Sequence, residues 1–140
     1  MAENNQLKSN KLIAAAASAR SAAYVPYSKF AVGAAILTKS GRIFAGCNVE
    51  NLSLGLTICA ERTAAAAAIA AGDKELVMIS VVTDSKRPAV PCGACRQVLA
   101  EFSPEMRIVA ATTTGEVEDF ELGGLLPKSA QGILESDRNV

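Results

Sequence analysis

The amino-acid sequence predicts a three-layer α/β fold, with helices covering both faces of a mixed sheet of about five strands. Helix-like and strand-like segments alternate along the chain in the order αββαβαββ, which favours this architecture. The length of 140 residues suits a single domain over residues 1–140, and no repeat or linker divides it. Apolar residues make up 50% and charged residues 20% of the chain, a composition typical of a globular protein.

The first half of the chain predicts a helix followed by a hairpin. Residues 7–24 are rich in alanine and carry apolar side chains at helical spacing, and Pro26 ends this helix. Residues 30–37 and 42–48 are strand-like. The Lys-Ser-Gly sequence at 39–41 joins them as a tight turn, with glycine where a positive φ is needed.

Two helices and three strands are expected in the second half. Residues 59–71 predict a helix that Gly72 closes at its C-terminal end, and residues 92–102 predict another. Residues 76–83 form an almost unbroken apolar run, which is typical of a strand buried on both faces. Two further strands are expected on either side of a Thr-Gly turn, at 107–112 and 117–120.

Charge and composition exclude several classes of function. The formal net charge is zero, and no cluster of lysine and arginine marks a nucleic-acid surface, so a small molecule is the expected partner. Residues 1–10 are polar, and no run of 18 uncharged apolar residues follows, so we expect no signal peptide, no membrane contact and a cytoplasmic location. In that reducing compartment the four cysteines favour metal ligation over disulfides.

Three of the four cysteines lie in two short motifs, Cys-Ala-Glu-Arg at 59–62 and Pro-Cys-Gly-Ala-Cys-Arg at 91–96. Cys59, Cys92 and Cys95 supply three soft ligands for one zinc ion per chain, and zinc with three protein ligands keeps its fourth position open for water. Both motifs begin predicted helices, whose N-terminal partial positive charge favours thiolates. Cys47 lies outside both motifs and is expected to be a small buried residue.

Charged side chains beside these cysteines predict catalysis. Glu61 stands two residues after Cys59, and a carboxylate next to an activated water can take and return protons. The chain has no histidine, so Glu61 is the strongest candidate for acid–base chemistry. Three thiolates on Zn²⁺ leave a net negative charge, which Arg62 or Arg96 could offset by donating hydrogen bonds to sulfur.

These motifs closely resemble the cytidine deaminase family of zinc-dependent nucleoside deaminases, in which a Cys₃ or His/Cys/Cys zinc site works with a glutamate that is not a ligand. The resemblance covers roughly residues 24–127. It extends to four further segments, at 27–30, 32–35, 46–51 and 125–127. The all-cysteine ligand set and the short length resemble the small homotetrameric branch, which implies a cytidine-deaminase-like three-layer domain that completes its sites across subunit interfaces.

The resemblance implies a function in pyrimidine salvage, the hydrolysis of cytidine and 2′-deoxycytidine to uridine and 2′-deoxyuridine with release of ammonia. In the family, a zinc-activated hydroxide attacks C4 of cytosine and the glutamate, here Glu61, shuttles protons. The family's sugar-binding pair matches Asn48 and Glu50, which would bind the 3′-hydroxyl. Its aromatic residue beside the base matches Phe30, and the segment around Ala60 would bind the pyrimidine edge.

Two positions depart from the family pattern and keep other functions open. Leu54 stands where the family usually has a tyrosine, and Ala130 where it has an aromatic ring that a neighbouring subunit lends to the base. A pocket without these rings could accept a bulkier or modified aminopyrimidine nucleoside, such as a cytosine-bearing antibiotic. A non-enzymatic zinc-stapled binding protein, with Cys47 as fourth ligand, and a redox CxxC are weaker alternatives. Editing of tRNA is disfavoured by the missing basic surface.

Overall fold

Five strands form a mixed sheet in the order β2-β1-β3-β4-β5 in the computed structural model, which describes residues 2–130. Both sheet ends are antiparallel hairpins, β1 with β2 and β4 with β5, and the parallel pair β3–β4 joins the two halves. The predicted mixed sheet is confirmed. The elements are α1 (Ala2–Arg20), β1 (Gly33–Thr38), β2 (Ile43–Cys47), the 3₁₀ turn η1 (Leu54–Leu56), α2 (Ala60–Ala70), β3 (Leu76–Thr83), α3 (Gly93–Phe102), β4 (Arg107–Thr112), β5 (Val117–Glu121) and α4 (Leu122–Leu125).

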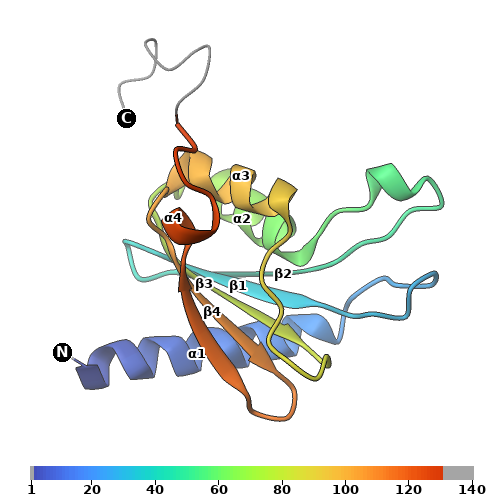
Figure 1. Cartoon of the computed structure of the whole chain (residues 1–140), viewed down its shortest axis with the longest axis horizontal. Coiled ribbons are helices and arrows are strands. Elements are labelled where there is room, and N and C mark those ends of the chain that lie inside the picture. The colour runs from blue at the N-terminus through green and yellow to red at the C-terminus, as the bar shows by residue number, and fades with distance from the viewer. Residues whose placement is uncertain (1, 131–140) are drawn as a thin grey trace.

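Helices cover both faces of the sheet, as the sequence predicts. Helix α1 lies along one face, and α2 and α3 lie side by side on the other (Figure 1). Strand β3 is mostly apolar because successive side chains enter opposite layers: Met78 and Val82 pack with α1, whereas Ile79 and Val81 pack with α2 and α3. The small side chains of α2, many of them alanine, allow this helix to lie close to the sheet.

The boundaries of the first elements differ from the prediction. Helix α1 ends at Arg20, before the predicted end, because the backbone of Tyr24 instead pairs with Asn48 and Glu50 beside the sheet. Strand β1 begins at Gly33 and not at residue 30, since the Asn48 side chain occupies the backbone groups of Phe30 and Val32. The short helices η1 and α4 were not predicted.

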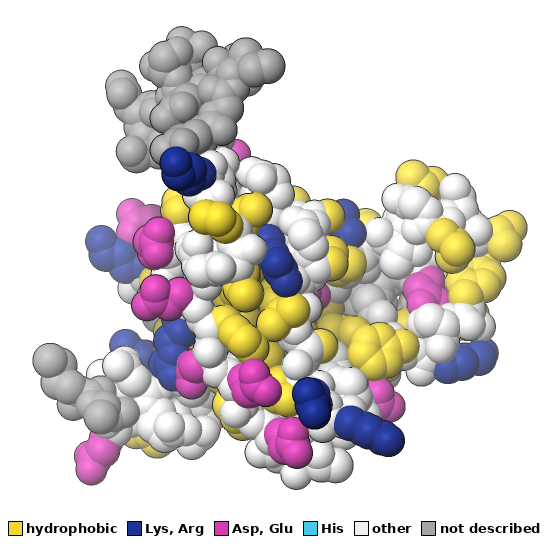
Figure 2. Space-filling model, viewed as in Figure 1, with side chains coloured by type: hydrophobic (Ala, Val, Ile, Leu, Met, Phe, Trp, Pro, Cys, Tyr) yellow, Lys and Arg dark blue, Asp and Glu magenta, His cyan; other side chains and the backbone are white. Residues whose placement is uncertain are grey.

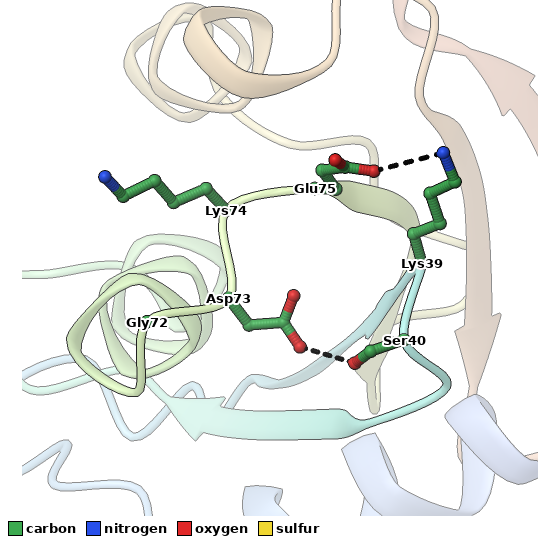
Figure 3. Close-up of a pocket in the computed structure, with 6 residues that line it drawn as sticks. All are labelled: Lys39, Ser40, Gly72, Asp73, Lys74 and Glu75. Atoms are coloured by element: carbon green, nitrogen blue, oxygen red, sulfur yellow. Dashed lines mark hydrogen bonds and ion pairs between the residues drawn. The ribbon is translucent and has the colours of Figure 1, made fainter.

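A charged recess of about 600 Å³ lies where the β1–β2 turn meets the loop between α2 and β3. Figure 3 shows Asp73 pointing across to the hairpin, where its carboxylate accepts hydrogen bonds from Ser40 Oγ at 2.6 Å and Thr38 Oγ1 at 2.7 Å. Gly41 has a φ of +91°, the positive value that the sequence predicted for the hairpin turn, and Gly72, which closes α2 as predicted, has a φ of +85°. None of the three metal-motif cysteines lines this recess.

The chain between β2 and α2 leaves the sheet as a projecting arm, defined here as residues 49–58 (Figure 1). Two isolated bridges tie its base together: Val49 pairs with Tyr24 on one side and with Ile58 on the other. Within the described residues, no helix combines the length and the apolar character needed to cross a bilayer.

Candidate metal centre and active site

Three cysteines meet at the N-terminal ends of two adjacent helices. Cys59 is the N-cap of α2, and Cys92 is the N-cap of α3, where its sulfur accepts a hydrogen bond from the backbone N–H of Cys95 at 3.5 Å. The three sulfur atoms lie within 4.8 Å of one another, and those of Cys59 and Cys92 are 3.9 Å apart. A tetrahedral zinc ion with Zn–S bonds of 2.3 Å requires sulfurs about 3.8 Å apart, so this cluster fits zinc. Cys47 is not part of the cluster.

The pKa values of two cysteines in the cluster are shifted in opposite directions. The pKa of Cys59 is lowered to about 5, first by a hydrogen bond from the Cys95 thiol and then by Arg62. The same hydrogen bond, together with burial, raises the pKa of the Cys95 thiol well above its ordinary value. The lowered pKa favours the thiolate form of Cys59, which is the form that binds a metal ion.

Each cysteine motif ends in an arginine, and the two arginines donate hydrogen bonds to different kinds of acceptor. Arg62 Nη2 donates to Cys59 Sγ at 3.3 Å, and the cysteine sulfurs raise the Arg62 pKa. Arg96 Nε donates instead to the Pro91 carbonyl at 2.8 Å, and its Nη1 to the Leu125 carbonyl at 3.2 Å. Arg62 therefore lies where it can offset thiolate charge, and Arg96 ties the loop before Cys92 to helix α4.

The Glu61 side chain lies in the first turn of α2 and is only 5% exposed. Burial raises its pKa to about 7, with a smaller contribution from the negative charge on Cys59, although the backbone and Arg62 act in the opposite direction. A buried carboxyl group beside three thiols is costly to keep charged, so the position is suited to a group that gains and loses a proton.

A cavity of about 240 Å³ opens beside the cysteines. The residues predicted from the sequence that line it are Phe30, Asn48, Cys59, Ala60, Glu61 and Cys92. Sequence reasoning missed its other lining residues, which are mostly apolar: Val32, Thr57, Val81, Thr83, Ala89 and Val90. The cavity lining therefore combines a few polar side chains with mostly apolar ones, as expected of a pocket that holds a small, partly polar ligand.

Two predicted substrate residues are already engaged with the protein. Asn48 Oδ1 accepts from the Val32 N–H at 2.9 Å, and its Nδ2 donates to the Phe30 carbonyl at 2.8 Å. The Glu50 carboxylate is not part of the cavity lining, but it accepts hydrogen bonds from Tyr27 and Ser28. Ser28 was missed, although its place in the 27–30 segment could have drawn attention to it.

The two unusual positions lie away from this cavity. Leu54 is 71% exposed in η1 on the projecting arm. Ala130 lines a separate recess of about 390 Å³, between Pro104 and the segment that follows α4. Neither side chain contributes to the cavity of its own chain.

Comparisons with known proteins agree with this geometry. The family described as the cytidine and deoxycytidylate deaminase zinc-binding region matches residues 7–112. The cytidine deaminase of Halalkalibacterium halodurans is 50% identical over 117 residues, 83% of this chain and 89% of the relative. That of Mycobacterium tuberculosis is 43% identical over 123 residues, 88% of this chain and 86% of the relative.

Solved structures agree as well. A crystal structure of cytidine deaminase from Burkholderia pseudomallei superposes with a TM-score of 0.82 and 49% identity, covering 85% of this chain and 96% of the other. The enzyme from Mycobacterium tuberculosis gives a TM-score of 0.74 at 42% identity, over 85% of this chain and 94% of the other. With matches of this identity and coverage, and with a three-cysteine cluster that fits one zinc ion per chain, the protein belongs to the zinc-dependent cytidine and deoxycytidylate deaminase family.

Proposed function

We propose that this protein hydrolyses cytidine and 2′-deoxycytidine, releasing ammonia and forming uridine and 2′-deoxyuridine. The observation that carries the proposal is the placement of a buried carboxyl group, Glu61, in one small cavity with Cys59 and Cys92. A purely structural zinc site closes its fourth position with another protein ligand and has no use for a buried acid there. Cys47, the fourth cysteine, is outside the cluster, which argues against a Cys₄ staple.

Cys59, Cys92 and Cys95 would hold the zinc. When bound, zinc supplies a Lewis acid that lowers the pKa of water and makes hydroxide available at neutral pH. Glu61 would accept one proton from that water and pass it to the ring nitrogen N3. It would then take the proton of the new hydroxyl on C4 and deliver it to the amino group, which leaves as ammonia as the C4 carbonyl forms. The whole reaction adds one water and removes one ammonia, so Glu61 returns to its starting state after each turnover.

Recognition of the nucleoside would be divided between three side chains and one backbone segment. Phe30 would offer a ring beside the base, and the backbone around Ala60 would bind the pyrimidine edge. Asn48 and Glu50 would bind the sugar 3′-hydroxyl. Glu50 can do so while holding its own loop, because a carboxylate accepts about four hydrogen bonds and protein donors occupy three of these positions.

The working form would be a homotetramer. Figure 2 shows hydrophobic side chains gathered on the projecting arm, where Leu52, Leu54 and Leu56 are 80%, 71% and 67% exposed. Exposed leucines so close together mark an interaction surface, and the small homotetrameric branch offers a second copy of the chain as its partner. Light scattering should give four times the chain mass of 14.5 kDa. Leu54→Glu should shift the protein to smaller species, and a monomeric wild-type protein would contradict the assignment.

A cytoplasmic location also remains a proposal. It rests on cysteines that work as metal ligands, which reducing compartments favour.

The deciding experiment is an ammonia-release assay on the zinc-loaded protein. The substrates should be cytidine, deoxycytidine, cytosine, adenosine and a series of modified cytidines, with zinc content measured on the same sample. Cytidine and deoxycytidine should be the best substrates. Turnover confined to bulky modified cytidines would instead favour the alternative substrate that Leu54 and Ala130 suggest. A zinc-loaded protein that releases ammonia from none of them would overturn the proposed function.

A further inference from the structure

One serine hydroxyl connects two residues of the proposed substrate pocket. Ser28 Oγ donates a hydrogen bond to Glu50 Oε2 and accepts one from the Phe30 backbone N–H at 3.0 Å. Phe30 lines the cavity, whereas Glu50 is not among its lining residues. Ser28 itself does not line the cavity, so its effect on a ligand passes through these two neighbours.

Further hydrogen bonds fix the same loop. The backbone N–H groups of Tyr27 and Ser28 donate to Glu50 Oε1 at 3.0 and 3.1 Å, and Nδ2 of Asn48 donates to the Phe30 carbonyl at 2.8 Å. The N–H and the C=O of Phe30 are therefore both held by side chains, not by a strand partner. A loop of this kind, outside the sheet, keeps one conformation only while such contacts last.

The backbone within this loop adopts an unfavourable conformation. Lys29, between Ser28 and Phe30, has φ of +61°, in the left-handed region that residues with a side chain seldom adopt. Such strain persists only where surrounding contacts determine the conformation, and it often accompanies a binding site. Here the hydroxyl of Ser28 bridges the strained residue, since it bonds to the Phe30 N–H on the far side of Lys29.

We propose that Ser28 is a positioning residue that sets the affinity of the pocket for nucleoside by holding Glu50 and Phe30 in place together. This inference rests on the proposed function. Oε1 of Glu50 already accepts two backbone hydrogen bonds, and Oε2 accepts the one from Ser28. Oε2 can accept one more hydrogen bond. Because Ser28 fixes the orientation of this carboxylate, it also fixes where the sugar hydroxyl would have to lie to donate that bond. The same contact places the aromatic ring that would lie beside the base.

The test compares Ser28→Ala, which removes the hydroxyl, with Ser28→Thr, which keeps it. Loss of a hydrogen bond to a charged group should raise KM for cytidine about tenfold in Ser28→Ala. The value of kcat should stay within about twofold, because the contact acts on binding and not on the reacting atoms. Zinc content should remain at the wild-type level. Ser28→Thr should restore KM close to that of the wild type.

A matched control is Ser21→Ala, which removes another exposed serine hydroxyl, one that donates only to the nearby Ser18 carbonyl at 2.7 Å. It should leave KM unchanged. Amide hydrogen exchange gives a readout that does not depend on turnover: the Phe30 N–H should exchange faster in Ser28→Ala than in the wild type or in Ser21→Ala. Unchanged Phe30 exchange, unchanged KM, or an equal fall of kcat and zinc content would each overturn the inference.

Failure of the inference and failure of the proposed function are distinguishable. Binding of uridine, the proposed product, can be measured by calorimetry without catalysis. Weaker uridine binding and faster Phe30 exchange in Ser28→Ala would support the positioning role even if the wild type released no ammonia from cytidine. Normal cytidine turnover with identical uridine affinity in wild type and Ser28→Ala would leave the function standing and remove the inference.

Discussion

Glu61 and Arg62 are adjacent in the sequence, but their surroundings at the cysteine cluster affect their charges in opposite ways. Glu61 is buried where a negative charge is disfavoured, and Arg62 lies where the cysteine sulfurs favour a positive charge. Both follow Cys59, the N-cap of α2, so the first turn of one helix sets both positions. Substitutions at these two residues should therefore separate proton transfer from metal retention.

Glu61→Gln keeps the size of the side chain and removes its ability to accept a proton. We expect this variant to retain about one zinc per chain, as the proposed ligand set requires, and to lose activity by about 10²–10⁴-fold. Ammonia release and metal analysis on the same sample check this. A variant that lost its zinc but kept its turnover per bound ion would show that Glu61 is a ligand.

Arg62→Ala removes the donor to Cys59 Sγ and should weaken zinc retention or activity by about 10–100-fold, the usual effect of partners of metal ligands. Arg62→Gln retains a donor and should be milder. Arg96→Ala serves as the comparison, because Arg96 donates to the carbonyls of Pro91 and Leu125 and not to sulfur. It should lower thermal stability more than zinc affinity. If all three variants bound zinc as tightly as the wild type, the helix N-termini alone would be sufficient to stabilise the thiolates.

Among the elements, the hairpins and motif helices were predictable, and the connections were not. Glycine turns, apolar runs and cysteine motifs are local signals, and they placed β3, α2 and α3 close to their observed bounds. The end of α1 depended on pairing of Tyr24 with residues 48–50, which are distant in sequence. The hydrogen bonds of Asn48 and Glu50 to the loop around Phe30 could not be predicted either. Sequence spacing does not reveal which partner a polar side chain will bind.

Strand β2 and helix α2 approach closely at Gly46. A methyl group added there would meet Thr63 Oγ1 and the backbone nitrogen of Ala64. Gly46→Ala should therefore destabilise the protein by about 1–3 kcal/mol and displace the helix that begins at Cys59. Gly124→Ala is the control, since nothing lies within 4 Å of its added carbon. Denaturant unfolding of both variants tests this, and equal stabilities would contradict it.

Asp73 stabilises the β1–β2 hairpin by accepting hydrogen bonds from Ser40 and Thr38, and this stabilisation should depend on pH. Hydrogen bonds from Ser40 and then Thr38 lower the Asp73 pKa. The stabilisation is therefore fully present above the ordinary aspartate value of about 3.9 and is lost as the pH falls through the lowered native value. Asp73→Asn should be less stable than wild type at pH 7 in urea unfolding, and the difference should narrow in acid. A difference that stayed constant with pH would contradict this.

At the scale of the whole molecule, the cysteine cluster joins two parts of the chain, the start of α2 and the start of α3. Any ligand that binds only the folded state stabilises it, by about 4 kcal/mol at 1,000 times its dissociation constant. Removing zinc with a chelator should therefore lower the melting temperature and abolish activity. It should also make the thiols of the cluster reactive, as a colorimetric thiol assay can measure. Restored zinc should reverse all three changes, and an unchanged melting temperature would contradict a role in stability.

The parallel pairing of β3 with β4 has a consequence for biosynthesis. The β1–β2 hairpin and β3 can pair before translation is complete. Helix α3 needs partners that are made later, because Leu99 packs in the same buried cluster as Ile108 of β4 and Leu122 of α4. A nascent chain that stops before β4 thus carries all three cysteines but lacks part of the buried cluster in which α3 packs. We therefore expect tight zinc binding only after translation has passed β4.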